Sequence, residues 1–201
     1  MGIKERRQRH RQELRGNILD AAREIASTEG WQSVTIRKIA ERIEYSPPAL
    51  YAYFDSKEDL LLELMRMGYA GQLEAVESAR KTSGSPEEAL AGIAHAWWSF
   101  AIKSPDLYQV MYGLGGVSFP ITELRQEGEK ISDVVGEVIE GILRKNGKEA
   151  KDVEGKVTLL WGTAHGLVAL AMAGRIVGGN EEAKRLVNQA ARDYLTAWLN
   201  T

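Results

Sequence analysis

Residues 35–64 read TIRKIAERIEYSPPALYAYFDSKEDLLLEL, and this stretch carries the strongest structural pattern in the chain of 201 residues. Its apolar residues follow the i, i+3, i+4, i+7 spacing of one buried helix face, at Ile36, Ile39, Ala40 and Ile43. Thr35 can cap this helix, and Ser46 can cap a second one. We expect that second helix to contain Leu50, Tyr51, Tyr53 and Phe54. The stretch therefore predicts two short helices joined by a tight turn.

Two such short helices are not stable alone, so longer helices are expected to cover them. One predicted helix runs from Arg11 to Glu29, with Gly30 as its stop. Another begins after Ser56, because Ser56 and Asp59 have the spacing of a capping box, and it extends to about Thr82.

The remaining sequence also predicts helices, since no stretch alternates apolar and polar residues for long enough to indicate a strand. Ser85, Pro86 and Glu88 give a strong start to a helix that ends near Lys103. Further helices are predicted from Pro105 and over residues 121–145, 150–177 and 181–199, with a glycine-rich loop at 113–120. The predicted fold is all-α, with about nine helices.

The composition excludes some kinds of site. The chain has no cysteine, so it has neither disulfides nor thiolate metal sites, and a reducing cytoplasm is the simplest compartment. Its net charge is −2, but residues 1–57 carry 11 Lys and Arg against 8 Asp and Glu, whereas residues 58–201 carry 15 against 20. A basic end suits contact with a polyanion, although a solvated basic tail without a partner would have the same composition.

No motif indicates an enzyme, a cofactor or a metal site. The three histidines, His10, His95 and His165, have no nearby His or Cys with ligand spacing. There is no P-loop, no Rossmann glycine pattern and no nucleophile–base spacing. The most apolar segment, residues 157–177, is interrupted by glycines, His165 and Arg175, so we expect a buried helix there rather than a membrane span.

Residues 18–64 resemble the DNA-binding part of the TetR family of bacterial regulators. The positions that carry the resemblance are Thr35, Ile39, Ala40, Ser46, Leu50, Tyr51, Tyr53, Phe54, Lys57 and Leu60. The spacing of Trp161, His165 and Gly166 is similar to that of a subgroup named for a Trp-His-Gly signature. The resemblance implies an arm and helix-turn-helix DNA-binding domain at residues 1–56 and a ligand-sensing and dimerisation domain at 57–201.

The resemblance also implies which residues meet double-stranded DNA. Residues at the positions of Thr35, Tyr51, Tyr53 and Lys57 commonly contact phosphate in the family. The full expected set is Thr35, Arg37, Lys38, Ser46, Pro47, Pro48, Ala49, Tyr51, Tyr53 and Lys57. The apolar Pro47-Pro48-Ala49 face can touch thymine methyl groups but cannot make bidentate hydrogen bonds. The arm with Arg6, Arg7, Arg9 and Arg11 is expected to reach a neighbouring minor groove or to screen phosphate.

Two positions depart from the family pattern. Glu44 stands where the family usually has a turn glycine, and a left-handed conformation would cost a non-glycine residue about 1–2 kcal/mol. The turn is therefore either strained or of different geometry. Pro48 disfavours α geometry for Pro47, so a start of the second helix one residue late is expected.

Aromatic residues gather in the second half of the chain and suit an apolar ligand pocket. The candidate ligand residues are Trp97, Trp98, Phe100, Tyr108, Met111, Tyr112, Trp161 and His165. An ordinary helix-bundle core would have the same composition, so both interpretations stay open. The last two helices are expected to form a homodimer, because their small residues permit close helix approach.

The predicted function is a ligand-responsive repressor that binds a palindromic operator as a dimer and is released by a small, largely apolar effector. Two alternatives remain at this point. One is a DNA-binding protein without an effector, and the other is a small helical enzyme.

Overall fold

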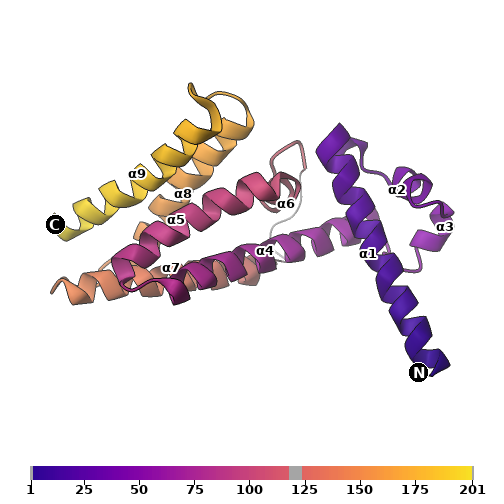
Figure 1. Cartoon of the computed structure of the whole chain (residues 1–201), viewed down its shortest axis with the longest axis horizontal. Helices are drawn as coiled ribbons and strands as arrows, with labels where there is room; N and C mark the ends of the chain where they lie inside the picture. The colour runs from indigo at the N-terminus through magenta and orange to yellow at the C-terminus, as the bar shows by residue number, and fades with distance from the viewer. Residues whose placement is uncertain (1, 118–123, 201) are drawn as a thin grey trace. The chain divides into compact units, whose positions relative to one another are not determined.

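The computed structural model describes residues 2–117 and 124–200, and in these ranges it contains nine α-helices, one 3-10 turn and no strand (Figure 1). This confirms the all-α prediction. Of the described residues, 2–68 and 105–117 form one compact unit, and 69–104 and 124–200 form a second. The predicted functional division into residues 1–56 and 57–201 stays a prediction, because packing divides the chain at other positions.

The first unit is built around a helix pair and the helices that cover it. Its elements are α1 (Ile3–Glu29), η1 (Trp31–Ser33), α2 (Ile36–Arg42), α3 (Pro47–Leu50), the first part of α4 (Lys57–Thr82) and α6 (Pro105–Met111). α1 packs against α2 and α6, and α2 packs against α3. The core residues include Leu14, Ile18, Ile25, Ile39, Leu50, Phe54, Leu60, Leu64 and Met111. The expected cover over the two short helices is therefore present.

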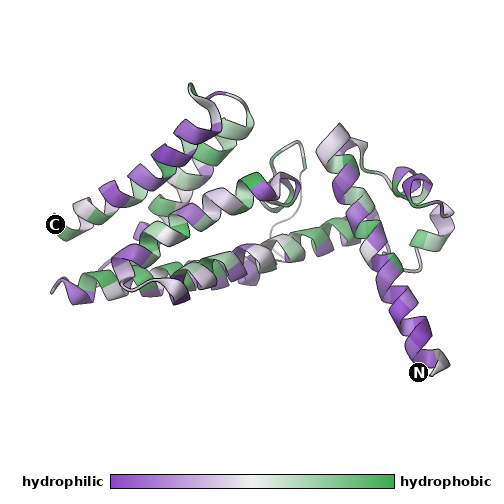
Figure 2. Ribbon diagram, in the orientation of Figure 1, coloured by the Kyte–Doolittle hydropathy of each residue, from purple (hydrophilic) through white to green (hydrophobic). Residues whose placement is uncertain are grey.

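α1 begins at Ile3, so the predicted start at Arg11 is wrong. Residues 4–13 in its first three turns are all exposed, and Figure 2 shows this end of the helix as hydrophilic. Apolar periodicity detects only helical turns that face a core. The first turns consist mainly of Lys, Glu, Arg and Gln, which are strong helix formers, and they continue the buried part without a break.

The second unit consists of the rest of α4 with four further helices. These are α5 (Pro86–Lys103), α7 (Arg125–Lys145), α8 (Val153–Met172) and α9 (Gly179–Asn200). α5 packs against α7, α8 and α9, and α8 packs against both α7 and α9. The predicted cap of α5 is confirmed, since the Ser85 Oγ accepts from the backbone N of Glu88 at 3.2 Å.

Three predicted boundaries differ from the structure. α8 ends at Met172 rather than at residue 177, because Gly174 takes a left-handed φ of 65°. The Arg175 N then donates to the Leu170 carbonyl and the Gly174 N to the Ala171 carbonyl, each at 2.9 Å, which is the Schellman pattern of a helix end. α8 begins at Val153, where Asp152 caps it, and α9 begins at Gly179.

The segment 118–123 lies outside the described residues, and with it the end of the predicted glycine-rich loop and the predicted start of the next helix. α7 is described from Arg125. Among the described helices, none is long and apolar enough to cross a membrane.

Candidate nucleic-acid interface

The turn between α2 and α3 is tight and strained. The Thr35 Oγ1 caps α2 by accepting from the Lys38 N at 3.2 Å, as predicted. At the other end of α2, Glu44 has a φ of 59°, and the Tyr45 N donates to the Ala40 carbonyl at 2.9 Å. The chain therefore makes the left-handed turn that glycine normally provides, at a cost of about 1–2 kcal/mol.

α3 begins at Pro47, so the expected late start is wrong. Ser46 is extended, with φ −81° and ψ 144°, a conformation that suits a residue before proline. Its side chain makes no capping hydrogen bond, contrary to the prediction. The prolines at the first two helical positions have no N–H, so the Ala49 N–H at the third position is the first donor within its reach. The Ser46 carbonyl instead accepts from the Ala49 N at 2.9 Å.

The aromatic residues after α3 lie in a hydrogen-bonded turn rather than in the helix. α3 ends at Leu50, whose carbonyl accepts from the Tyr53 N at 2.9 Å and the Phe54 N at 3.1 Å. Leu50 and Phe54 are buried, whereas the Tyr51 side chain between them is 54% exposed. The two buried residues therefore fix the turn, and Tyr51 points out of it.

The predicted DNA-contact residues lie on α2, α3 and their flanks, with differing accessibility. Thr35, Arg37, Ser46, Pro48 and Tyr51 are exposed. The half-buried members are Lys38, Pro47, Ala49, Tyr53 and Lys57. The structure therefore brings this set to one helix-turn-helix, whose exposed α3 residues offer no side-chain hydrogen-bond donor until Tyr51.

Two of the basic residues in this set already have acidic partners. The Arg37 Nε lies 2.9 Å from Glu41 Oε1 on the same helix, and the Lys38 ammonium pairs with Glu29. These are ion pairs of exposed or half-exposed groups, which contribute little to stability. Both cations can therefore exchange a carboxylate for a phosphate at low cost.

Two arginines of α1 reach the turn after α3, and no local sequence pattern predicts these contacts. The Arg11 Nη2 donates to the Ala52 carbonyl at 3.3 Å, and its guanidinium carbon lies 5.9 Å from the centroid of the Tyr53 ring. The Arg15 guanidinium lies 4.9 Å from the Phe54 ring centroid. The only signal in the sequence was the spacing of Arg11 and Arg15, which continues the apolar face of α1.

Arg15 also forms an ion pair with a carboxylate next to this turn. Its Nη1 lies 3.0 Å from Glu63 Oε1 on α4. The hydrogen bond from Arg15 is the main reason why the pKa of the Glu63 carboxyl lies below its usual range. Glu63 is therefore ionised at neutral pH and joins α1 to α4 within the first unit.

Comparisons with known proteins agree with this geometry. Residues 18–64 match the family described as "Bacterial regulatory proteins, tetR family", and residues 90–194 match "Tetracyclin repressor-like, C-terminal domain". The chain belongs to the TetR family. This family consists of bacterial regulatory proteins, and the prediction that the chain is not an enzyme agrees with it.

Individual TetR-family relatives are distant. The chain is 29% identical over 97 residues to the transcriptional repressor NicS of Pseudomonas putida, which is 48% of this chain and 46% of NicS. It is 27% identical over 142 residues to the transcriptional activator FasR of Mycolicibacterium smegmatis, which is 70% of this chain and 64% of FasR. The matches thus span about half to two thirds of these relatives.

A solved structure supports the fold over almost the whole chain. A protein of unknown function from Rhodococcus sp. RHA1 superposes with a TM-score of 0.78 at 21% identity, covering 92% of this chain and 94% of that one. Because the identity is low, this similarity concerns the TetR-like fold alone.

The candidate ligand residues of this TetR-family protein are distributed over both units. In the second unit, Trp97 and Trp98 are buried on α5 and Phe100 is half-buried. The Trp97 Nε1 is buried and has no hydrogen-bond partner among the described residues. The packing thus leaves a donor inside the second unit, where an unsatisfied N–H is costly.

Trp161 and His165 form a stacked pair on α8, with ring centroids 5.3 Å apart and an interplanar angle of 19°. The predicted shared face is therefore present. Burial lowers the pKa of the His165 imidazole, so this ring is neutral at pH 7. The remaining candidates, Tyr108, Met111 and Tyr112, belong to α6 and the residue after it in the first unit. Ligand contact by these residues stays a prediction.

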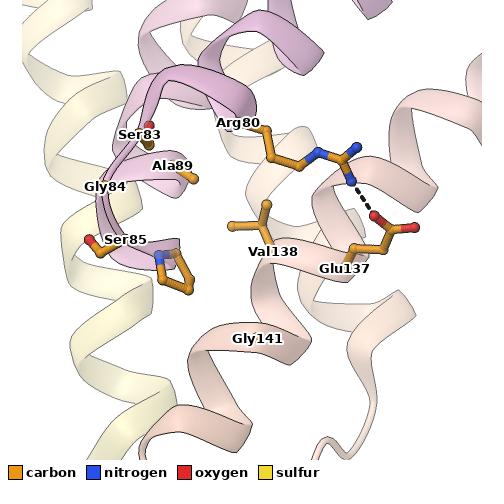
Figure 3. Close-up of a pocket in the computed structure, with 9 residues that line it drawn as sticks. Arg80, Ser83, Gly84, Ser85, Ala89, Glu137, Val138 and Gly141 are labelled. Atoms are coloured by element: carbon orange, nitrogen blue, oxygen red, sulfur yellow. Dashed lines mark hydrogen bonds and ion pairs between the residues drawn. The ribbon is translucent and has the colours of Figure 1, made fainter.

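Pockets of the second unit lie elsewhere. One of about 330 Å³ is lined by Arg80, Ser83, Gly84, Ser85, Pro86, Ala89, Glu137, Val138 and Gly141. Figure 3 shows the Arg80–Glu137 ion pair on one side of it and the Ser83–Ser85 turn on the other. A larger groove of about 650 Å³ between α7 and α8 is lined mainly by carboxylates and Arg125. Neither contains a candidate ligand residue, and no group of described residues could hold a metal ion.

Proposed function

We propose that this TetR-family regulator is a ligand-responsive repressor that binds a palindromic operator as a homodimer. The observation that carries the DNA-binding part is the exposed α3 surface and the Tyr51 side chain, held outward by the buried Leu50 and Phe54. A large aromatic residue kept in water next to a helix-turn-helix suits phosphate contact. Repression is the commoner behaviour in the family, and NicS is a transcriptional repressor, whereas FasR is an activator.

We propose that the protein makes few specific contacts with DNA bases and binds mainly to the phosphate backbone. Pro47, Pro48 and Ala49 offer apolar surface to thymine methyl groups. Arg37 and Tyr51 supply the nearest polar groups. Sequence preference then depends in part on the shape and deformability of the operator.

The homodimer is proposed from one face of α8. The helix buries a single stripe, at Val157, Leu160, Ala164 and Val168. The opposite face consists of Leu159, Gly162, Gly166, Leu170 and Ala173, and there Leu159 is 55% and Leu170 45% exposed. A helix that is apolar all round normally lies inside a protein, and a second copy of the chain would cover this face and bring two α3 helices to one palindrome.

The effector is proposed to bind near α5. The buried Trp97 Nε1 without a partner among the described residues supports a ligand that carries a hydrogen-bond acceptor within an apolar body. A ligand that binds one dimer arrangement better shifts the population away from DNA-competent spacing.

Two chain segments would transmit that shift. α4 is continuous from the first unit into the second. In addition, α5 ends at Lys103 and α6 begins at Pro105, so the helix that carries Trp97 leads directly into the helix that packs on α1. We place the protein in the cytoplasm, where an operator would be accessible.

The test of DNA contact uses Tyr51. An operator obtained by selection from random DNA is titrated with Tyr51→Ala, which should bind at least about tenfold more weakly, because a hydrogen bond to a charged group contributes roughly 1.5–3 kcal/mol and a dimer loses one in each protomer. The control is Tyr45→Ala, which removes an aromatic residue that is 41% exposed and outside the expected contact set. Equal affinity of Tyr51→Ala and wild type would contradict the role of Tyr51.

A further inference from the structure

The first three turns of α1 form a basic helix with no structural task in the core. They contain Lys4, Arg6, Arg7, Arg9 and Arg11 against two acidic residues, Glu5 and Glu13. All of these side chains are exposed. A helix of this charge attracts an anion strongly only where several of its cations share one face.

The cations divide between two faces of the helix. Lys4, Arg7 and Arg11 follow at steps of three and four residues and lie on one face. Arg6 and Arg9 lie on the other side, because each residue advances the helix by about 100°. The first three turns of α1 therefore carry two basic faces, which point in different directions.

The contacts of Arg11 and Arg15 show which face of α1 lies against the turn after α3. Arg11 donates to the Ala52 carbonyl and lies over the Tyr53 ring, and Arg15 lies over the Phe54 ring. Arg7 lies one turn before Arg11 and Lys4 about two turns before it. This face therefore continues the side of α1 that meets the turn after α3.

The length and the width of α1 limit which part of DNA the face with Lys4, Arg7 and Arg11 can contact. Lys4 lies about 10 Å beyond Arg11 along the helix axis, which corresponds to roughly three base pairs at 3.4 Å per pair. A helix with side chains is about 10–12 Å wide, whereas the minor groove is about 6 Å wide. The intact helix cannot enter that groove, whereas its long exposed cations can reach the phosphates of the backbone beside it.

We propose that Lys4, Arg7 and Arg11 form a phosphate-binding ridge that extends the operator contact by about three base pairs beyond the helix-turn-helix. The inference rests on the proposed DNA binding and adds a site to it. A guanidinium carries five N–H donors, so Arg11 can hold the Ala52 carbonyl and a phosphate together. The ridge adds affinity without base preference, because phosphate contacts carry no sequence information.

The test compares two double variants with the same change of charge. Lys4→Ala/Arg7→Ala removes two cations of the ridge, and Arg6→Ala/Arg9→Ala removes two cations of the opposite face. Alanine is the best helix former, so both variants keep the helix, which circular dichroism checks. The measurement is the dissociation constant for a selected operator at several KCl concentrations.

Each lost phosphate contact changes the slope of log K against log salt by about 0.9. We expect Lys4→Ala/Arg7→Ala to flatten the slope by about 1.8 per protomer, and so by about 3.6 for a dimer on a palindromic operator, and to weaken binding at least about tenfold at 0.1 M salt. The Arg6→Ala/Arg9→Ala variant should change the slope by less than about 0.5. Base preference should be the same in both variants.

Equal changes in the two variants would overturn the ridge and leave only a general attraction of the arm. An unchanged slope in both would also overturn it, while leaving the helix-turn-helix intact. If wild-type protein selects no DNA at all, the proposed function fails first and the ridge fails with it.

Discussion

The carboxylate of Asp106 on α6 is buried, with 5% of its side chain exposed, and it is held by the guanidinium of Arg23 on α1, whose Nε lies 2.5 Å from Oδ2. A second contact joins Arg23 Nη2 to Oδ1 at 3.5 Å. Both helices belong to the first unit. The pair therefore fixes α6, the segment that follows the tryptophan-bearing α5, to the helix that supports the DNA-binding turn.

Removing Arg23 should destabilise the first unit strongly, because a buried carboxylate would lose its partner. We expect Arg23→Met to lower the free energy of unfolding by about 2–3 kcal/mol, somewhat less than for a fully buried pair since Arg23 is partly exposed. Urea unfolding measures this. Arg66→Ala, which removes an exposed partner of Glu63, should cost less than about 0.5 kcal/mol.

A double variant separates charge burial from packing. Arg23→Met/Asp106→Leu should be more stable than Arg23→Met alone, because the unpaired buried charge is gone. A double variant as unstable as the single one would contradict the assignment of the loss to the Asp106 carboxylate.

Glu44→Gly should stabilise the first unit. Glu44 is exposed and left-handed, and glycine relieves about 1–2 kcal/mol of strain while losing somewhat less than 1 kcal/mol to unfolded-chain entropy. We expect a net gain of up to about 1 kcal/mol in thermal or chemical unfolding. Glu44→Ala retains a Cβ and should show no gain, so an equal gain in both variants would contradict strain at this position.

The Glu63–Arg15 pair should contribute to stability only above acidic pH. The folded pKa of Glu63 is depressed, so its contribution is complete above the unfolded value of about 4.3 and is lost as pH falls through the lower folded value. Glu63→Gln should therefore be less stable than wild type at pH 7, by at most about 1 kcal/mol for a partly exposed pair. The difference should shrink below about pH 4, and a difference independent of pH would count against the pair.

Introducing charge on the exposed face of α8 should separate the proposed dimer. Leu159→Glu/Leu170→Glu places two carboxylates where a second copy would pack, and burial of an unpaired charge is costly. We expect a dimer for wild type and a monomer for this variant by analytical ultracentrifugation at micromolar concentration. Ser78→Glu, an exposed change on α4, should leave the dimer intact, whereas a monomeric wild type would refute the interface.

The parts of the fold that depend on neighbouring residues could be predicted from the sequence. Such local signals are the Thr35 cap, the spacing of Ile36 to Ile43 and the helix start at Ser85-Pro86. The structure confirms the caps of α2 and α5. The first turns of α1 left no apolar pattern because residues 4–13 are all exposed. The predicted Ser46 cap is absent, since the two prolines have no N–H and the Ala49 N–H donates to the Ser46 carbonyl rather than to the side chain.

The long-range contacts could not be predicted. Arg23 and Asp106 are 83 positions apart, and Arg11 and Ala52 are 41 apart. No local rule pairs such residues, and each arginine had several carboxylates or carbonyls available. The sequence could not predict which candidate ligand residues are buried. The same residue type lies in the core as Trp97 and on the exposed surface as Trp161.

Operator binding by a dimer is tested most directly by selection of DNA from a random library with the purified full chain, followed by sequencing of the bound molecules. We expect one enriched motif with two-fold symmetry, with half-sites about one helical turn or a multiple of it apart, as two α3 helices of a dimer require. Recovery of DNA with no motif above the starting library, or of a single unpaired half-site, would contradict it.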